Sequence, residues 1–385
     1  MLRVITMNDI TYITYQTFPA HTANSLQTIS VIKYLARNNK KVKLIFPDRS
    51  SLSNDDINEL QNFYGFNETF EVTKTHHNYP FRDYLGDSNF KKVRFHISHF
   101  LWSKKVVKKV LQENNTKTYF TRSDWVFYFL NRNNQKVIYE CHQVSKLRKF
   151  IINHLITSKN CEIVYTNELL KGNFKDDKKS TVIHNAYDED LFSNEILDMN
   201  NKQVVFVGNL LRFGKDRNIN FLIECFSHPS LENYQLVVVG GPDSYKDKLI
   251  TSIKDAGINN VRILGRLDRK DTIKIIENSE YGILINTSLS IHSTHHTSPL
   301  KYFEYLRARL KIVAIDFPSH RTLPMSNGIL FFEENNIDSF IEAIRKFSSI
   351  QRDESLYYKN FSYDVRIEKI LDVAARLEGL EPPTL

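Results

Sequence analysis

Thr297-Ser298-Pro299-Leu300-Lys301-Tyr302-Phe303-Glu304-Tyr305-Leu306, followed by Lys311-Ile312-Val313-Ala314-Ile315-Asp316, is the stretch that decides the fold. It predicts a loop, a short helix over 299–308 and a buried strand over 311–315. Ser298 before Pro299 is typical of a helix start, because the hydroxyl accepts a bond from a free amide and proline has no amide to satisfy. A short helix that leads into a buried strand indicates a parallel α/β sheet.

The start of this helix is a candidate nucleotide site. Free N–H groups and the positive end of the helix dipole favour a diphosphate there. Glu304 lies one turn into the helix, where a carboxylate can accept hydrogen bonds from both hydroxyls of a ribose. The residues alone leave a second interpretation open, an ordinary amphipathic helix with a glutamate on its surface.

The stretch resembles the donor-binding segment of glycosyltransferase family 4, which commonly has Ser-Pro-Leu-Lys-x-Phe-Glu-Tyr-Leu-Ala before a strand. The resemblance implies that Ser298, Leu300 and Lys301 help to hold a nucleotide sugar. Glu304 matches the second carboxylate of the family's Glu-x7-Glu motif, which contacts the ribose, whereas the first falls on His296. Many members with the Ser-Pro-Leu-Lys form also lack that first glutamate. We therefore expect a variant site in which His296 contacts sugar or phosphate.

Strand-like apolar runs alternate with helical patterns in both halves of the chain. Candidate strands lie at 2–7, 42–46, 68–72, 118–121, 136–139 and 162–166, then at 204–208, 236–240, 261–265, 281–285, 311–315 and 329–332. This alternation predicts two α/β halves with parallel sheets. The stretch 182–192 resembles the family's interdomain sequence, which implies two Rossmann-like domains over 1–184 and 185–360. The resemblance implies that they face each other across a cleft, the GT-B arrangement. It also implies that 361–385 forms a helix that crosses back to the first domain, plus a tail.

The composition is that of a globular protein with two domains. The chain has 385 residues, of which 41% are hydrophobic and 25% are charged. No run approaches a transmembrane span, and the first eight residues are too short and polar for a signal peptide. Its three cysteines form neither a disulfide framework nor a zinc motif. We expect a protein of the reducing cytoplasm.

Most of the formal charge of +8 lies in the segment 91–117, which holds eight lysines and arginines and one glutamate. The lysine pairs 104/108 and 105/109 repel each other at helical spacing unless something anionic lies opposite. A solvated helix face is the favoured interpretation. Peripheral contact with an anionic membrane on the inner face, as in family members with lipid-linked acceptors, stays open. Nucleic-acid binding is not predicted, because no recognised module accompanies the charge.

The loop Gly208-Asn209-Leu210-Leu211-Arg212-Phe213-Gly214-Lys215 follows a predicted strand. Glycine allows a close backbone approach, and arginine or lysine can neutralise a diphosphate leaving group. Family members often have Gly-Arg here, with a lysine six residues after the arginine. Lys215 matches that lysine, and Asn209 replaces the arginine. Arg212 is close enough in sequence to take its place.

Two further strand ends carry family-like residues. Gly265-Arg266-Leu267 resembles a Leu-Gly-Arg-Val whose backbone meets the base, which places Arg266 and Leu267 at the nucleotide. Tyr139-Glu140-Cys141-His142 resembles Tyr-Glu-x-His-Asp, in which the histidine orients the donor sugar. The strand ends at Gly208, at Gly240-Gly241-Pro242 and at Gly265 should converge on one sheet edge, where open α/β sheets bind ligands.

The resemblance implies a retaining glycosyltransferase that moves a sugar from a nucleotide diphosphate to a hydroxyl of a glycan or a lipid-linked acceptor, in surface polysaccharide synthesis. No cofactor and no metal ion are expected. The histidine cluster at 292, 295 and 296 has no cysteine or acid within it, and Asp188-Glu189-Asp190 matches the family's interdomain linker. A non-catalytic nucleotide-sugar binder in a glycan-assembly complex is the alternative.

Overall fold

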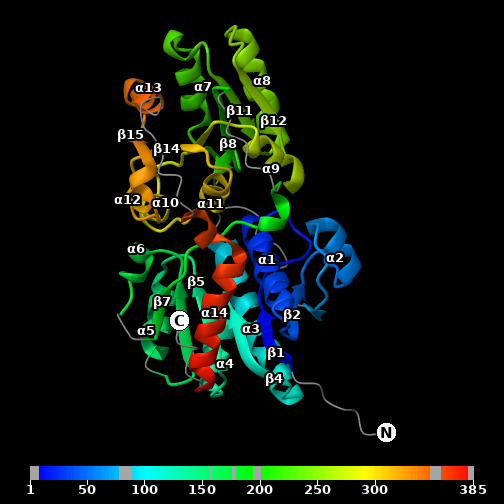
Figure 1. Cartoon of the computed structure of the whole chain (residues 1–385). Coiled ribbons are helices and arrows are strands. Elements are labelled where there is room, and N and C mark those ends of the chain that lie inside the picture. Colours follow the sequence, from blue (N-terminus) through cyan, green and yellow to red (C-terminus); the bar gives the residue numbers. More distant parts are fainter. Residues whose placement is uncertain are drawn as a thin grey trace. The chain divides into compact units, whose positions relative to one another are not determined.

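The computed structural model describes residues 8–77, 89–156, 158–175, 179–193, 201–212, 214–346 and 357–379. The chain divides into a first unit, residues 1–183 with 363–385, and a second unit, residues 184–362. Each is built of strands and helices that alternate along the chain (Figure 1). Within the described residues, no helix is both long enough and apolar enough to cross a membrane.

The first unit contains a seven-stranded parallel sheet with the order β3-β2-β1-β4-β5-β6-β7. Its strands are β1 (Asn8–Ile13), β2 (Val42–Asp48), β3 (Glu71–His76), β4 (Thr116–Thr121), β5 (Val137–Cys141), β6 (Cys161–Tyr165) and β7 (Ser180–Val182). Every residue of β5 and β6 is buried, and eight of their ten residues are apolar, as expected of inner strands of a parallel sheet; the exceptions are Glu140 and Glu162. The predicted strand at 2–7 lies outside the described residues. The first observed strand, β1, begins directly after it, at Asn8.

The helices of the first unit are α1 (Ala23–Arg37), α2 (Ile57–Tyr64), α3 (Asn89–Glu113), α4 (Asp124–Arg132), α5 (Lys146–Leu155), α6 (Glu168–Lys171) and α14 (Tyr363–Glu378). Hydroxyls at the N-caps fix where α1, α4 and α5 begin, since Thr22, Ser123 and Ser145 each accept a bond from a first-turn amide. The closing helix α14 packs on α1, β5 and β6.

The second unit contains a six-stranded parallel sheet with the order β12-β11-β8-β13-β14-β15. Its strands are β8 (Gln203–Val207), β11 (Gln235–Val239), β12 (Val261–Gly265), β13 (Tyr281–Leu284), β14 (Lys311–Ile315) and β15 (Ile329–Phe332). All six strands predicted for this half are confirmed. Two short strands, β9 (Leu211–Arg212) and β10 (Lys215–Asp216), pair with each other in an antiparallel ribbon that is separate from this sheet.

Helices cover both faces of this second sheet, as its alternating side chains require. They are α7 (Ile219–Ser227), α8 (Asp243–Asp255), α9 (Arg269–Glu277), α10 (Ile291–His295), α11 (Leu300–Arg307), α12 (Pro318–Arg321) and α13 (Ile337–Lys346). Val204 and Phe206 of β8 belong to one apolar core with α7, α8 and α13. Val205, between them, belongs to another with α9 and α11.

The strand order of the second unit creates a switch point at β8. From β8 the chain builds outward through β11 and β12, and it then returns to build β13, β14 and β15 on the other side. Where two neighbouring strands of an open parallel sheet connect in opposite directions, their carboxyl ends leave room for a ligand. The residues that follow β8 and β13, and the helix α11, therefore frame the candidate site.

Candidate functional site

Three strand ends of the second unit meet at one edge, and glycine makes this possible. The amide of Gly208, after β8, donates to Val239 at 2.9 Å, and the amide of Gly240, after β11, donates to Gly265 at 2.8 Å. A Cβ on Gly240 would lie 1.8 Å from the carbonyl oxygen of Gly208, and φ at Gly240 is +156°. Only glycine fits there. The predicted convergence of the strand ends is confirmed.

Lys301, in the first turn of α11, carries the most unusual charge at this edge. The residue is 8% exposed, and within the described part of the chain its Nζ has no hydrogen-bond acceptor. It lies over the ring of Phe206, 3.8 Å from the ring centroid, and 4.0 Å from the point where a Cβ on Gly208 would stand. Burial, with a further contribution from Arg217, lowers the pKa of Lys301 well below its ordinary value. A buried ammonium without an anion is costly, so the side chain is arranged to meet one.

Arg217 is a second cation at the same place, and sequence reasoning missed it. Its Nε donates to the Oδ1 of Asn286, which follows β13, at 3.3 Å. Its guanidinium comes within 3.6 Å of the point where a Cβ on Gly208 would lie. Lys301 and Arg217 thus flank the backbone of Gly208, an arrangement that suits a diphosphate. The sequence does show Arg217 as a basic residue in the loop after β8. The resemblance, however, drew attention to Lys215 and Arg212 in the same loop.

Lys215 and Arg212 are paired with each other in the β9–β10 ribbon. The side chain of Lys215 is exposed, and that of Arg212 lies outside the described part of the structure. Asn209 is exposed as well. Their roles at a diphosphate stay predictions.

Glu304 lies one turn after Lys301 on α11, and its side chain is only 6% exposed. The surface-glutamate interpretation is therefore wrong. Its Oε1 accepts from Nη2 of Arg269, the first residue of α9, at 2.5 Å. A carboxylate has about four acceptor positions, so this ion pair leaves capacity for a diol. Arg269 was also missed, because nothing in the sequence links residues 35 apart.

The helix start differs from the prediction in one respect. The N-cap of α11 is Pro299, with no side-chain capping bond, so the expected cap by the Ser298 hydroxyl is wrong. That hydroxyl is buried without a partner among the described residues. The Ser298 carbonyl instead accepts from the Asn185 side chain at 2.5 Å, which fixes the loop before the helix. Leu300 begins the helix and is half-buried.

The residues after β12 lie beside the glycine turn of β11. Nε of Arg266 is 3.5 Å from the point where a Cβ on Gly241 would stand. Arg266 is exposed and Leu267 is half-buried. Their predicted contact with a base is not tested by this geometry.

His296 follows α10 and is 4% exposed. Its amide donates to the His292 carbonyl at 3.1 Å, and its ring centroid is 6.3 Å from those of both His292 and His295. Among the described residues, no group of three or more histidines, cysteines or acids is placed to hold a metal ion. The role of His296 toward sugar or phosphate stays a prediction.

In the first unit, His142 follows β5 and is held by a buried carboxylate. Its Nε2 is 2.5 Å from Oε1 of Glu140, and Glu140 also pairs with Arg122 and with Arg366 of α14, both at 2.7 Å. Burial, reinforced by Arg122, lowers the pKa of His142 to about 4, so the ring is neutral at pH 7. The two arginines hold the pKa of Glu140 well below its usual range despite its burial. Because Glu140 is ionised and can only accept, Nε2 carries the proton and Nδ1 is the acceptor.

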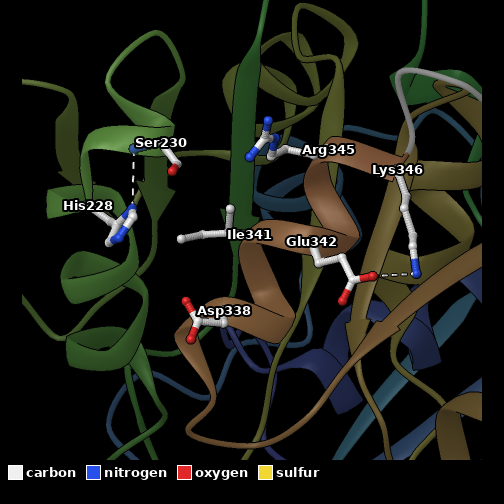
Figure 2. A pocket seen from close by; sticks show the side chains of 7 residues that line it. All are labelled: His228, Ser230, Asp338, Ile341, Glu342, Arg345 and Lys346. Carbon is white, nitrogen blue, oxygen red and sulfur yellow. Dashed lines mark hydrogen bonds and ion pairs between the residues drawn. The ribbon is translucent and has the colours of Figure 1, made fainter.

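A surface groove of the second unit holds none of the predicted site residues. Figure 2 shows it between the 3-10 turn η2 (Pro229–Leu231) and α13, lined by His228, Ser230, Asp338, Ile341, Glu342, Arg345 and Lys346. Glu342 and Lys346 pair across one turn at 2.7 Å. All of these side chains except Ile341 are exposed, so the groove lacks the buried cation that distinguishes the glycine edge.

Comparisons with known proteins agree with this picture. Residues 188–365 match the family model described as "Glycosyl transferases group 1". A sucrose-phosphate synthase from Thermosynechococcus elongatus has a TM-score of 0.65 at 13% identity, over 97% of this chain and 98% of that one. A mutant of TarM from S. aureus, solved with UDP, has a TM-score of 0.65 at 13% identity, over 96% and 100%. The pneumococcal O-GlcNAc transferase GtfA, solved with UDP and GlcNAc, has 0.65 at 10%, over 96% and 99%.

These likenesses confirm the predicted fold class, two Rossmann-like α/β domains of the kind found in GT-B glycosyltransferases. A comparison with curated protein sequences gives no match. The family match covers the second unit, with Lys301, Arg217 and Glu304, and ends at the start of α14. The match therefore supports a glycosyltransferase function for this chain.

Proposed function

We propose that the protein is a glycosyltransferase that moves a sugar from a nucleotide-diphosphate donor to a hydroxyl group of a glycan or lipid-linked acceptor. The anomeric configuration is retained, and the product belongs to a surface polysaccharide. The match of the second unit to group 1 glycosyl transferases supports this. The observation that carries it is the buried ammonium of Lys301, which meets no acceptor among the described residues and lies beside Gly208 and Arg217.

The chemistry would depend on electrostatics supplied by the chain itself. Lys301 and Arg217 stabilise the negative charge that develops on the departing diphosphate, in a buried place where such charges interact strongly. With two cations in the site, the leaving group needs no metal ion. Lys215 and Arg212, on the β9–β10 ribbon, are the further cations proposed for this step.

Glu304 anchors the nucleotide through its ribose. Its carboxylate keeps the ion pair with Arg269 and accepts from the diol with its remaining lone pairs. Arg269 therefore sets the orientation of the carboxylate. His142 positions the sugar, because its neutral ring donates from Nε2 to Glu140 and offers Nδ1 to a sugar hydroxyl.

Thermal shift with a panel of nucleoside diphosphates and nucleotide sugars tests the donor site. A matching nucleotide at about one hundred times its Kd stabilises the protein by about 2.7 kcal/mol, which a melting curve detects. Lys301→Met should remove most of this stabilisation. Failure of every nucleotide to shift the wild-type melting temperature would refute a nucleotide site.

Arg345→Gln is the matched control, because Arg345 is also a cation of the second unit but lines the surface groove. It should bind nucleotide like the wild type. If Arg345→Gln loses binding and Lys301→Met keeps it, the nucleotide occupies the groove and the assignment of the site is wrong.

A non-catalytic nucleotide-sugar binder is the second candidate, favoured by His296 at the position of the family's first glutamate and Asn209 at that of its arginine. Donor hydrolysis separates the two. Slow release of free sugar from the nucleotide that binds, lost in Lys301→Met, supports the enzyme. Saturable binding with no turnover of any donor supports the binder.

A further inference from the structure

The solvent face of α3 carries four large apolar side chains that the described residues leave largely exposed, although the Arg94 guanidinium lies over the ring of Phe90, 5.5 Å from its centroid. Phe90, Val93, Ile97 and Leu101 are 70%, 56%, 50% and 39% exposed. Their spacing of three, four and four residues places them on one side of the helix. Isolated exposed apolar residues are ordinary, but four in a row along one helix form a patch of the kind that marks an interaction surface.

The same face continues as a run of cations. Lys104, Lys105, Lys108 and Lys109 follow Leu101 and are all exposed. The opposite side of this part of the helix is packed in the core of the first unit through Trp102, Val106 and Val110. The solvated lysine face predicted from the sequence is therefore real, but its apolar neighbour was not foreseen.

Nothing in the described part of the chain balances these charges. None of the four lysines forms an ion pair with a described residue, and the one acidic residue of α3, Glu113, pairs instead with Lys43 at 3.4 Å. Like charges four residues apart destabilise a helix unless an anion lies opposite. The face therefore suits a partner that offers both an apolar interior and a dense array of negative groups.

We infer that this face of α3 binds the surface of an anionic membrane (Figure 1 shows the helix). The four apolar side chains enter the boundary between headgroups and acyl chains, and the four lysines contact anionic headgroups. A second copy of the chain fits less well, because it would bring lysines against lysines or against apolar groups. A nucleic acid would leave the apolar half without a partner. The inference is independent of the proposed function, since it concerns binding in the absence of any donor.

Sedimentation of the full chain with vesicles tests it. We expect binding to vesicles of phosphatidylcholine with 30% phosphatidylglycerol and little binding to phosphatidylcholine alone, with a marked loss at high salt. Each lysine near an anionic surface contributes about 1 kcal/mol. The quadruple variant with Lys→Gln at 104, 105, 108 and 109 should therefore bind on the order of several hundredfold more weakly. Ile97→Ser with Leu101→Ser should weaken binding separately, at constant charge.

The helix α8 provides the matched control, because it exposes Ile250 to 43% and also exposes Lys248 and Lys254. Ile250→Ser with Lys248→Gln and Lys254→Gln should leave vesicle binding unchanged. All variants change exposed side chains, and equal melting temperatures would show that they fold. The inference would be overturned if the wild-type protein did not bind anionic vesicles. It would also be overturned if the α3 variants bound them as well as the α8 variant does. A third contrary result would be a wild-type dimer that becomes monomeric in the Ile97→Ser, Leu101→Ser variant, because this face would then join two copies of the chain.

Discussion

Lys301 illustrates at the scale of one residue how a binding site lowers the stability of a fold. Its ammonium is buried against an aromatic ring and has no acceptor among the described residues. Methionine has nearly the same length and no charge to desolvate. Lys301→Met should therefore raise the free energy of unfolding of the nucleotide-free protein by about 1–3 kcal/mol. Denaturant unfolding measures this, and a clear destabilisation would mean that the amine has a structural partner.

The same lysine should couple nucleotide binding to proton uptake. In the free protein the pKa of Lys301 is well below its ordinary value, and a neighbouring diphosphate raises it. The complex then holds more protons than the free protein, so affinity falls as the pH rises through the pKa of the free form. The diphosphate diester of a nucleotide sugar has no group that titrates near neutrality. Calorimetry in buffers of different ionisation enthalpy should detect uptake for the wild type and none for Lys301→Met.

At the scale of elements, Glu140 joins β5 to the end of β4 and to α14. It pairs with Arg122 and with Arg366, and the carboxylate is fully buried. Glu140→Gln removes the carboxylate that two buried guanidinium groups share, so it should destabilise the first unit by about 3–5 kcal/mol. Because the pKa of Glu140 is lowered in the fold, its stabilisation is present above the unfolded pKa and is lost as the pH falls through the folded one.

Glu162→Gln is the control for this prediction. Glu162 also links the sheet to α14, through Arg376, but at 3.5 Å and with Arg376 36% exposed. Because Arg376 reaches solvent, although Glu162 is buried, this longer pair should contribute only about 1 kcal/mol. Urea unfolding of both variants should therefore separate them clearly, and equal losses would contradict the role given to the buried charges.

The elements of the second unit could be predicted from the sequence because they are local. Short apolar runs that end in glycine, such as the one before Gly240, carry their own stop signal. The cap of α11 was mispredicted because the Asn185 side chain holds the Ser298 carbonyl, a contact over 113 residues that no local pattern reports. Arg217 and Arg269 were missed for the same reason. Their importance comes from Gly208 and Glu304, which only the folded sheet brings near them.

At the scale of the whole molecule, the C-terminal helix belongs to the unit that begins the chain. In α14 the buried apolar residues are Tyr363, Ile367, Ile370, Val373, Ala374 and Leu377, and the first of them stacks on Tyr34 of α1. Each large apolar side chain contributes about 1.5–3 kcal/mol when buried. Their sum is comparable to the total stability of a domain, about 5–15 kcal/mol.

A chain that ends at Ser362 should therefore lose the folded first unit and keep the second. The truncation removes Arg366 from Glu140 and uncovers one face of the sheet, while Lys301, Arg217 and Glu304 all lie in residues 184–362. Calorimetry should show one transition instead of two, and a nucleotide that binds the full chain should still raise the remaining one. A chain that ends at Gly379 keeps α14 and should melt like the full chain. Loss of the nucleotide response on removal of α14 would mean that the donor site depends on the first unit.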